Sequence, residues 1–222
     1  SLVGSEMCIR DSSRAVKGKV VGYLQKVQEG IENCLAIHIH RTPISLKAYC
    51  KILINMYQSR IVGLGHYVPE NIVTNEDLSK LMDTDDVWIT DRTGIKERRL
   101  IKKDSGEGTA SMGVKASEMA LERSGISKDD IDIVIYATLS PDLYFPGSGV
   151  LLQDLMRMGT CPALDIRNQC SGFIYGLSVA DQFIKTGMYK NILLVGSEYH
   201  SGGMDFTTRG RTVSVIFGDG AG

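Results

Sequence analysis

From residue 60 onward, the chain alternates short apolar segments with longer segments that are apolar at helical spacing. The short segments are β-branched and apolar on both faces, which is typical of strands buried between two layers of helices. Five such strands are predicted, at residues 60–66, 131–138, 161–166, 191–197 and 212–218. Strands separated by helices predict an α/β layered fold.

Two of the intervening segments, residues 108–125 and 171–187, carry an amphipathic helical pattern. In the first, the apolar face comprises Met112, Ala116, Met119 and Ala120. In the second, it comprises Phe173, Leu177, Ala180 and Ile184. The first segment ends at a glycine, Gly125, as helices often do.

The first 55 residues do not share this alternation. Residues 1–12 have no period of 2 or 3.6 and look like the translation of a sequencing adapter, so we interpret residues 1–55 as a non-native or upstream-translated extension. His38 and His40, with Cys34 nearby, lack a fourth ligand at usable spacing and do not predict a metal site. We place the native start at Met56 and expect one domain over residues 56–222, truncated at its C-terminus.

The overall composition excludes several classes of protein. The chain has 25 Lys and Arg against 26 Asp and Glu, so it creates no global field that would attract nucleic acid or an anionic membrane. No apolar run approaches the roughly 18 residues of a membrane span. Five cysteines without a CxxC pair predict neither a disulfide framework nor a zinc site. We therefore expect a cytoplasmic protein that binds no metal, nucleic acid or membrane.

One cysteine, Cys170, lies at the junction of a predicted strand and a predicted helix. The strand ends near Ile166, residues 167–169 form a polar break, and Ser171 opens the helix. At a helix N-terminus, free N–H groups and the positive end of the helix dipole favour a thiolate over a thiol. The same N–H groups can stabilise the oxyanion that forms when a carbonyl is attacked. The position therefore indicates a nucleophile.

The residues alone leave a second interpretation of Cys170 open. A cysteine among apolar segments is often inert core packing. A nucleophilic cysteine also needs a partner such as histidine, and the candidates are His66, at the end of the first predicted strand, and His200. Either histidine could be an ordinary turn or surface residue.

Five motifs resemble, in order and spacing, β-ketoacyl-acyl carrier protein synthase III, a family of thiolase-like condensing enzymes. They are DDVWITDRTGIKERR (85–99), FPGSGVLLQ (145–153), RNQCSGFIYGLSVADQFIKTGMYKNILLVGSE (167–198), TTRGR (207–211) and IFGDGAG (216–222). The resemblance covers residues 56–222. It implies a thiolase-like layered fold of which this chain holds the N-terminal half of a pseudo-duplicated structure, with a large apolar face left uncovered.

The resemblance also implies roles for individual residues. Cys170 matches the active-site cysteine that accepts an acyl group from acyl-coenzyme A. Trp88 matches a tryptophan that packs on the adenine, and Arg209 matches an arginine on its other side. Thr84 and Arg92 match neighbours that hold the nucleotide and its phosphates. From the residues alone, Trp88 could equally be a core aromatic and Arg92 part of a solvated face.

Phe145 matches a residue that reaches across a dimer interface towards the partner's acyl pocket, so the resemblance implies a homodimer. From the sequence alone, Phe145 could equally be a loop anchor.

The reaction implied is the start of type II fatty acid synthesis, in which an acyl group, typically acetyl, joins malonyl-acyl carrier protein with loss of carbon dioxide. The resemblance implies no permanently bound cofactor. It places the family's catalytic His and Asn in the C-terminal half, so this chain alone is expected to be inactive. A related synthase, for hydroxymethylglutaryl-coenzyme A or a specialised metabolite, and a non-catalytic fragment remain alternatives.

Overall fold

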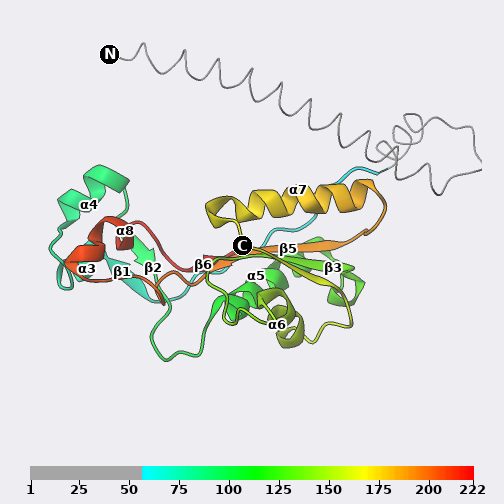
Figure 1. The fold of residues 1–222 in the computed structure, drawn as a ribbon, viewed down its shortest axis with the longest axis horizontal. Helices are drawn as coiled ribbons and strands as arrows, with labels where there is room; N and C mark the ends of the chain where they lie inside the picture. Colours follow the sequence, from blue (N-terminus) through cyan, green and yellow to red (C-terminus); the bar gives the residue numbers. More distant parts are fainter. Residues whose placement is uncertain (1–56) are drawn as a thin grey trace, which may run out of the picture. The chain divides into compact units, whose positions relative to one another are not determined.

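The computed structural model describes residues 57–222 (Figure 1). Our interpretation of residues 1–55, including Cys34, His38 and His40, lies outside the described residues. The elements are, in order, β1 (Ile72–Thr74), α3 (Asn75–Ser79), α4 (Asp86–Thr93), β2 (Glu97–Arg99), α5 (Thr109–Ser124), the short 3-10 helix η1 (Lys128–Asp130), β3 (Ile133–Ala137), α6 (Ser148–Leu155), β4 (Ala163–Ile166), η2 (Gln169–Ser171), α7 (Gly172–Lys185), β5 (Ile192–Glu198), η3 (Thr208–Gly210), α8 (Arg211–Ser214) and β6 (Gly220–Ala221).

A four-stranded sheet with the order β4-β3-β5-β6 forms the centre of the fold. The central strand β3 is parallel to both β4 and β5, whereas β6 runs antiparallel to β5. On the outer side of β6, Tyr67 forms an isolated antiparallel bridge with Ala221. The predicted strands at 131–138, 161–166 and 191–197 are confirmed, and so is the α/β class.

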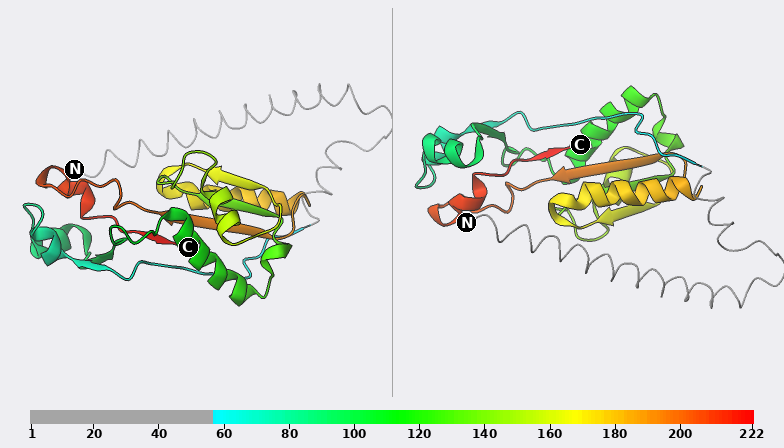
Figure 2. Two further views of the ribbon diagram at one scale, coloured as in Figure 1. Left: turned by 90° about the horizontal axis from the view of Figure 1, so that it is seen from below. Right: turned by 90° about the horizontal axis from the view of Figure 1, so that it is seen from above.

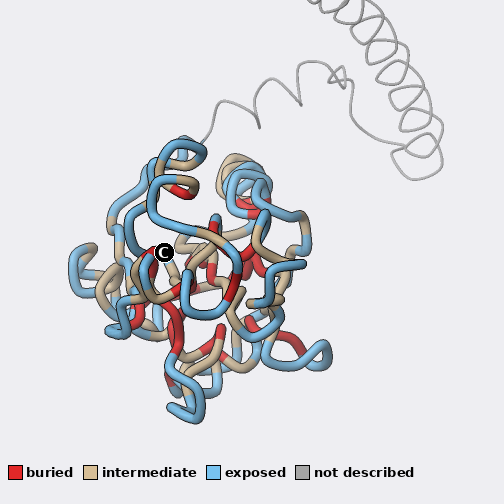
Figure 3. Tube along the Cα trace, turned by 90° about the vertical axis from the view of Figure 1, so that its left-hand side faces the viewer, coloured by how far each residue is buried: buried red, intermediate tan, exposed pale blue. Residues whose placement is uncertain are grey.

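Helices cover both faces of this sheet. On one face, Val134 and Tyr136 belong to a buried cluster with Leu152 of α6, and Val114 of α5 packs against it. On the other face, Ile135 belongs to a cluster with Ala180 of α7. Figure 1 accordingly shows α7 on one side of the strands and α5 and α6 on the other, and Figure 3 shows buried residues in red inside the fold. This two-sided cover explains why the strands are apolar on both faces.

Helix α5 forms where the amphipathic pattern predicts it. Its N-terminus is closed by reciprocal hydrogen bonds between Gly108 and the Ser111 side chain, and it ends at Gly125 in the left-handed conformation, with φ of 70°. Met112 and Ala116 are buried against the sheet. The predicted boundaries and the predicted C-terminal glycine are therefore confirmed.

A smaller group of elements holds α4 beside the main sheet. Strands β1 and β2 pair antiparallel, and α3, α4 and the segment after α8 enclose a buried cluster of Leu78, Met82, Ile89 and Val215. The buried Asn75 amide donates to Asp86 Oδ1 at 2.8 Å and to the Ile95 carbonyl at 2.7 Å. These bonds fix both ends of α4 relative to α3.

Two predicted strands are wrong. Residues 60–66 join no sheet in the described part of the chain, and only Tyr67 reaches a strand. Gly63 and Gly65 lie directly against the backbone of α5. In the segment 212–218, the chain first forms α8, and Val215 is then buried against Leu78 of α3. Strand pairing begins only at Gly220, so Val215 fills a core and not a sheet, while Val213 and Ile216 are exposed.

We predict that Gly65→Ala destabilises the fold by about 1–3 kcal/mol, the usual effect of forcing an extra group into a packed site. A Cβ at Gly65 would overlap the carbonyl oxygen of Ala116 and lie 2.6 Å from the Ala120 nitrogen. Gly159→Ala is the matched control, since no atom lies within 4 Å of a Cβ there. Urea unfolding measures both variants, and equal midpoints would show that the segment does not pack on α5.

Candidate active site

Cys170 lies in the turn that joins β4 to α7. It is the central residue of η2 (Gln169–Ser171), and α7 begins at Gly172 directly afterwards. The predicted position between a strand and a helix is therefore confirmed. The side chain is exposed, and the turn follows the carboxyl end of a parallel strand, the edge at which α/β sheets bind ligands. The thiol is open to a substrate.

The turn around Cys170 is tight. Gln169 adopts φ of 40°, a left-handed conformation that is uncommon for a residue with a side chain. The Ser171 hydroxyl donates to the Asn168 carbonyl at 3.2 Å. Gly172 is buried, and a Cβ at this position would lie 3.3 Å from the Cβ of Ala137, at the end of β3. The Gly172 N–H donates to the Gln169 carbonyl, so η2 runs directly into α7 and the start of the helix is held at the carboxyl edge of the sheet.

The neighbouring strand ends are fastened to one another by Glu198, the last residue of β5. Its carboxylate accepts from the Leu139 N–H at 2.8 Å and from the Ser140 hydroxyl at 2.6 Å, both just after β3. The Ser140 oxygen in turn accepts from the Tyr199 N–H at 2.7 Å. Hydrogen bonds therefore connect the ends of β3 and β5 at the sheet edge on which Cys170 lies.

Neither candidate histidine is bonded to the thiol within residues 57–222. His200 places Nδ1 3.2 Å from the Gly218 carbonyl and stacks on Phe217 with ring centroids 4.7 Å apart. His66 is exposed and lines a cavity with Phe173. The contacts of His200 are those of a structural residue.

The second cysteine that the structure describes, Cys161, has a different environment. It is half-buried, its sulfur lies 3.6 Å from the amide nitrogen of Gln153, and burial raises the pKa of its thiol. Cys161 is therefore the less reactive of the two, and it provides an internal comparison for Cys170.

Trp88 forms a second candidate site on α4. Asp85 caps this helix by accepting from the Trp88 N–H at 2.7 Å. The indole is half-buried against the cluster that contains Ile89. Two guanidinium groups lie over it, with Arg92 at 4.5 Å and Arg211 at 4.8 Å from the ring centroid. Both distances are within the range of cation–π attraction.

The other residues expected around Trp88 lie in two different environments. The Thr84 hydroxyl oxygen is buried and has no hydrogen-bond partner among the described residues. The Arg209 side chain is 89% exposed and pairs with Asp205 at 2.8 Å. Hydrogen bonds from Thr207 and then Arg209 lower the pKa of Asp205 from 3.8 to about 2.

Arg211, which lies over Trp88, was not among the residues expected from the sequence. It is the second arginine of the motif TTRGR, two positions after Arg209. Arg211 is held by the carbonyl of Asp83 and by the Asp83 carboxylate at 3.7 Å.

Phe145 lies in the loop between β3 and α6. It is 89% exposed, and the adjoining Leu143 and Tyr144 are also exposed. The guanidinium of Arg167, three residues before Cys170, lies 5.2 Å from the centre of the Tyr144 ring. The loop thus presents an apolar surface near the turn that carries the cysteine.

Within residues 57–222, no cluster of three or more His, Cys, Asp or Glu side chains could hold a metal ion. None of the helices in this part of the chain is long and apolar enough to cross a membrane.

Comparison with known proteins finds relatives of this chain. Residues 164–222 match the family model for 3-oxoacyl-[acyl-carrier-protein (ACP)] synthase III. The chain is 46% identical over 167 residues to the β-ketoacyl-[acyl-carrier-protein] synthase III of Clostridium novyi (strain NT), an alignment that covers 75% of this chain and 50% of the relative. The chain is a homologue of β-ketoacyl-[acyl-carrier-protein] synthase III.

Other synthase III proteins give the same result. A β-ketoacyl-[acyl-carrier-protein] synthase III 1 of Bacillus anthracis is 48% identical over 162 residues, which is 73% of this chain and 51% of that protein. The crystal structure of 3-oxoacyl-[acyl-carrier-protein] synthase III from Aquifex aeolicus VF5 superposes with a TM-score of 0.69 at 44% identity and covers 73% of this chain and 51% of that one. The fold is therefore the α/β thiolase-like fold, and the chain spans about half the length of the synthase III relatives it matches.

We predict that Arg211→Ala makes Trp88 more accessible to acrylamide, because the variant loses a cation–π contact of about 0.5–1 kcal/mol. Trp88 is the only tryptophan, so fluorescence reports this site alone. Arg209→Ala is the control and should leave the quenching constant unchanged, since that side chain points into solvent. Equal quenching in the two variants would contradict the placement of Arg211.

Proposed function

We propose that the chain carries the acyl-accepting site of a condensing enzyme that starts type II fatty acid synthesis in the cytoplasm. The observation that supports this most directly is the exposed Cys170 at a strand–turn–helix junction, on the carboxyl edge of the sheet, in a homologue of synthase III. A thiol in this position is open to substrate and lies at the N-terminal end of α7, where the helix dipole favours the thiolate.

The first half-reaction needs only this site. The Cys170 thiolate attacks the carbonyl carbon of an acyl-coenzyme A thioester, typically acetyl. Free N–H groups at the start of α7 stabilise the oxyanion of the tetrahedral intermediate. The intermediate collapses with cleavage of the original carbon–sulfur bond, coenzyme A leaves as a thiolate that takes up a proton, and an acyl-cysteine remains. No metal or bound cofactor takes part.

The coenzyme A moiety binds, in this proposal, at Trp88. The flat indole offers a surface for adenine, and Arg209 can lie on the other side of the adenine. Thr84 and Arg92 can hold the nucleotide and its phosphates. Because Arg211 already lies over the indole at 4.8 Å, the adenine must share the ring with this guanidinium or displace it.

The second half-reaction is condensation with malonyl-acyl carrier protein. Decarboxylation of the malonyl group gives an enolate, which attacks the acyl-cysteine and releases the Cys170 thiolate together with the β-ketoacyl product and carbon dioxide. The His and Asn that assist this step in the family are expected outside the half that this chain matches. We therefore propose that the chain alone supports acylation and not condensation.

Phe145 and its exposed neighbours support a homodimer in the complete enzyme. A loop that presents three exposed apolar side chains near an active-site turn is typical of a surface covered by another subunit. In the dimer we propose, Phe145 reaches towards the partner's acyl pocket.

The test is covalent labelling with acetyl-coenzyme A. After incubation and digestion, mass spectrometry should find the acetyl group on the peptide that contains Cys170. Cys170→Ala should lose the label, because only the thiolate attacks a thioester, whereas Cys161→Ala should keep it. Label that survives in Cys170→Ala, or a folded wild-type chain that takes up none, would overturn the assignment.

A further inference from the structure

The smaller group of elements around α4 contains three of the four buried side-chain atoms that lack a hydrogen-bond partner among residues 57–222. These three are Asn75 Oδ1, Thr84 Oγ1 and Arg98 Nε, and the fourth, Ser148 Oγ, lies on α6. Buried polar atoms are nearly always bonded in native proteins, so each exception needs a physical reason. Local rules are broken most often at functional sites, and three exceptions in one small group point to function.

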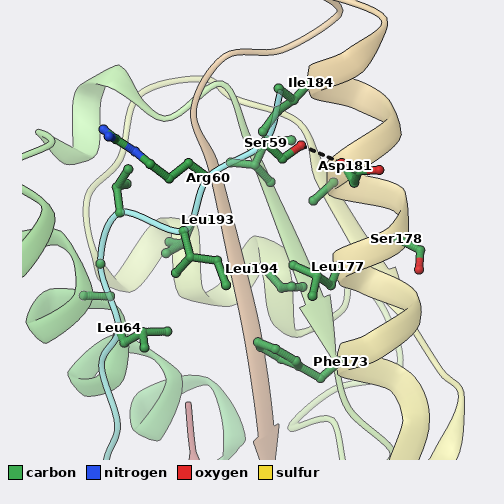
Figure 4. Close-up of a pocket in the computed structure, with 16 residues that line it drawn as sticks. Ser59, Arg60, Leu64, Phe173, Leu177, Ser178, Asp181, Ile184, Leu193 and Leu194 are labelled. Carbon is green, nitrogen blue, oxygen red and sulfur yellow. Dashed lines mark hydrogen bonds between the residues drawn. The ribbon is translucent and has the colours of Figure 1, made fainter. Parts of the chain in front are cut away.

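A cavity of about 470 Å³ beside β5 differs from this group (Figure 4). Three of the polar side chains that line it are bonded within the chain. Ser59 donates to Asp181 at 2.8 Å, and Ser178 donates to the Ile174 carbonyl at 3.1 Å. None of the four unpartnered atoms lines this cavity, so they do not belong to it.

Arg98, the middle residue of β2, is the charged member of the three. It is 6% exposed, and no carboxylate of residues 57–222 pairs with it. Nη1 donates to the Val73 carbonyl at 3.2 Å and Nη2 to the Val215 carbonyl at 3.1 Å. Burial lowers the pKa of Arg98 from its usual value, as expected for a cation that has lost its water. Because a buried charge without a counter-charge opposes folding, stability does not explain an arginine at this position.

The two hydrogen bonds of Arg98 join segments that are far apart in the sequence. Val73 lies opposite Arg98 on the paired strand β1. Val215 directly follows α8 and is buried in the cluster with Leu78. Figure 2 shows in both views that the red segment containing α8 lies beside the blue-green elements of this group. Arg98 therefore fastens the end of α8 to the β1–β2 pair.

Helix α8 begins at Arg211, the residue whose guanidinium lies 4.8 Å from the centre of the Trp88 ring. Two bonds hold the far end of this helix. Ser214 donates to the Asp205 carbonyl at 2.7 Å, and the carbonyl of the next residue accepts from Arg98. Asp205 lies in a loop, whereas Arg98 lies in a strand pair, so Arg98 connects α8 to regular structure.

We propose that Arg98 is a positioning residue for the coenzyme A site, because it holds α8 where Arg211 lies over Trp88. The consequence for coenzyme A rests on the proposed function, whereas the consequence for the indole does not. A guanidinium suits such a site because it is planar, always charged and able to contact an aromatic ring and a phosphate. Arg98 thus opposes folding at its own position and fixes a second arginine where a ligand can meet it.

The variant Arg98→Met tests this role, because methionine keeps an unbranched apolar side chain and removes the charge and both hydrogen bonds. We expect a urea midpoint no lower than that of the wild-type chain, since the buried charge is gone. The acrylamide quenching constant of Trp88 should nevertheless rise to that of Arg211→Ala. The double variant should be quenched no more than Arg211→Ala alone, because Arg98 acts through Arg211.

Arg99→Met is the matched control. Arg99 is the next residue of β2 and also donates to two backbone carbonyls, those of Pro69 and Glu70, but it does not bond α8. Its replacement should leave the quenching of Trp88 unchanged.

Acylation of Cys170 provides the functional measurement. In Arg98→Met, the acetyl-coenzyme A concentration that gives the half-maximal rate should rise about two- to fivefold, the equivalent of one lost cation–π contact. The rate with S-acetyl-N-acetylcysteamine, a thioester without a nucleotide, should stay the same. A wild-type chain that takes up no acetyl group would contradict the proposed function, and the quenching of Trp88 would still test the role of Arg98.

Two outcomes would overturn the proposal. The first is a folded Arg98→Met chain in which Trp88 is quenched as in the wild type, whatever the urea midpoint. The second is a double variant that is quenched more than Arg211→Ala, which would show that Arg98 acts independently. If Arg98→Met does not fold, Arg98→Lys decides, since it keeps the charge without the planar fork. Increased quenching in this variant supports the proposal, and wild-type quenching contradicts it.

Discussion

Helix α7 rests on the sheet through residues that have almost no side chain. Gly172, Gly176 and Ala180 are its buried residues, and a Cβ at Gly176 would lie 2.6 Å from a methyl group of Leu194. Small residues at this spacing let the helix axis approach the strands closely, as close packing of apolar interiors requires. Among the larger side chains of the helix, Val179 and Phe183 pack against the cluster of Ile133 and Ile135, and Phe173 lies beside Gly196 of β5.

This close approach determines where the cysteine lies. Because Gly172 meets Ala137 at the end of β3, the first turn of α7 starts at the carboxyl edge of the sheet, and the turn before it must be tight. Cys170 is then held at the surface, while Cys161, only nine residues earlier, is half-buried. The same edge is stiffened by Glu198, so the position of the thiol depends on the sheet as a whole.

The local sequence pattern predicted the three parallel strands, helix α5 and the junction at Cys170. Strands buried on both faces are apolar throughout, and the end of α5 is indicated by a glycine. Prediction from the local pattern failed for segments whose structure depends on contacts with residues distant in the sequence. The residues of 60–66 and 212–218 have strand-like composition, yet the first segment packs on α5 and pairs with no strand among the described residues, and Val215 is buried against Leu78 of α3. For the same reason, nothing in TTRGR could indicate that Arg211 lies over Trp88. The roles of Thr84, Arg92 and Phe145 came from resemblance alone and remain predictions.

The central claim is that the packing of α7 on the sheet places Cys170 for acylation. The most direct measurement is the rate of acetyl transfer from acetyl-coenzyme A to Cys170 in Gly172→Val, compared with Gly159→Val, where a side chain meets nothing within 4 Å. Because a small displacement of a nucleophile is costly, we predict that Gly172→Val slows the transfer at least about tenfold, or about 1.4 kcal/mol, and that Gly159→Val does not. A folded Gly172→Val chain that is acylated at the wild-type rate would contradict the account.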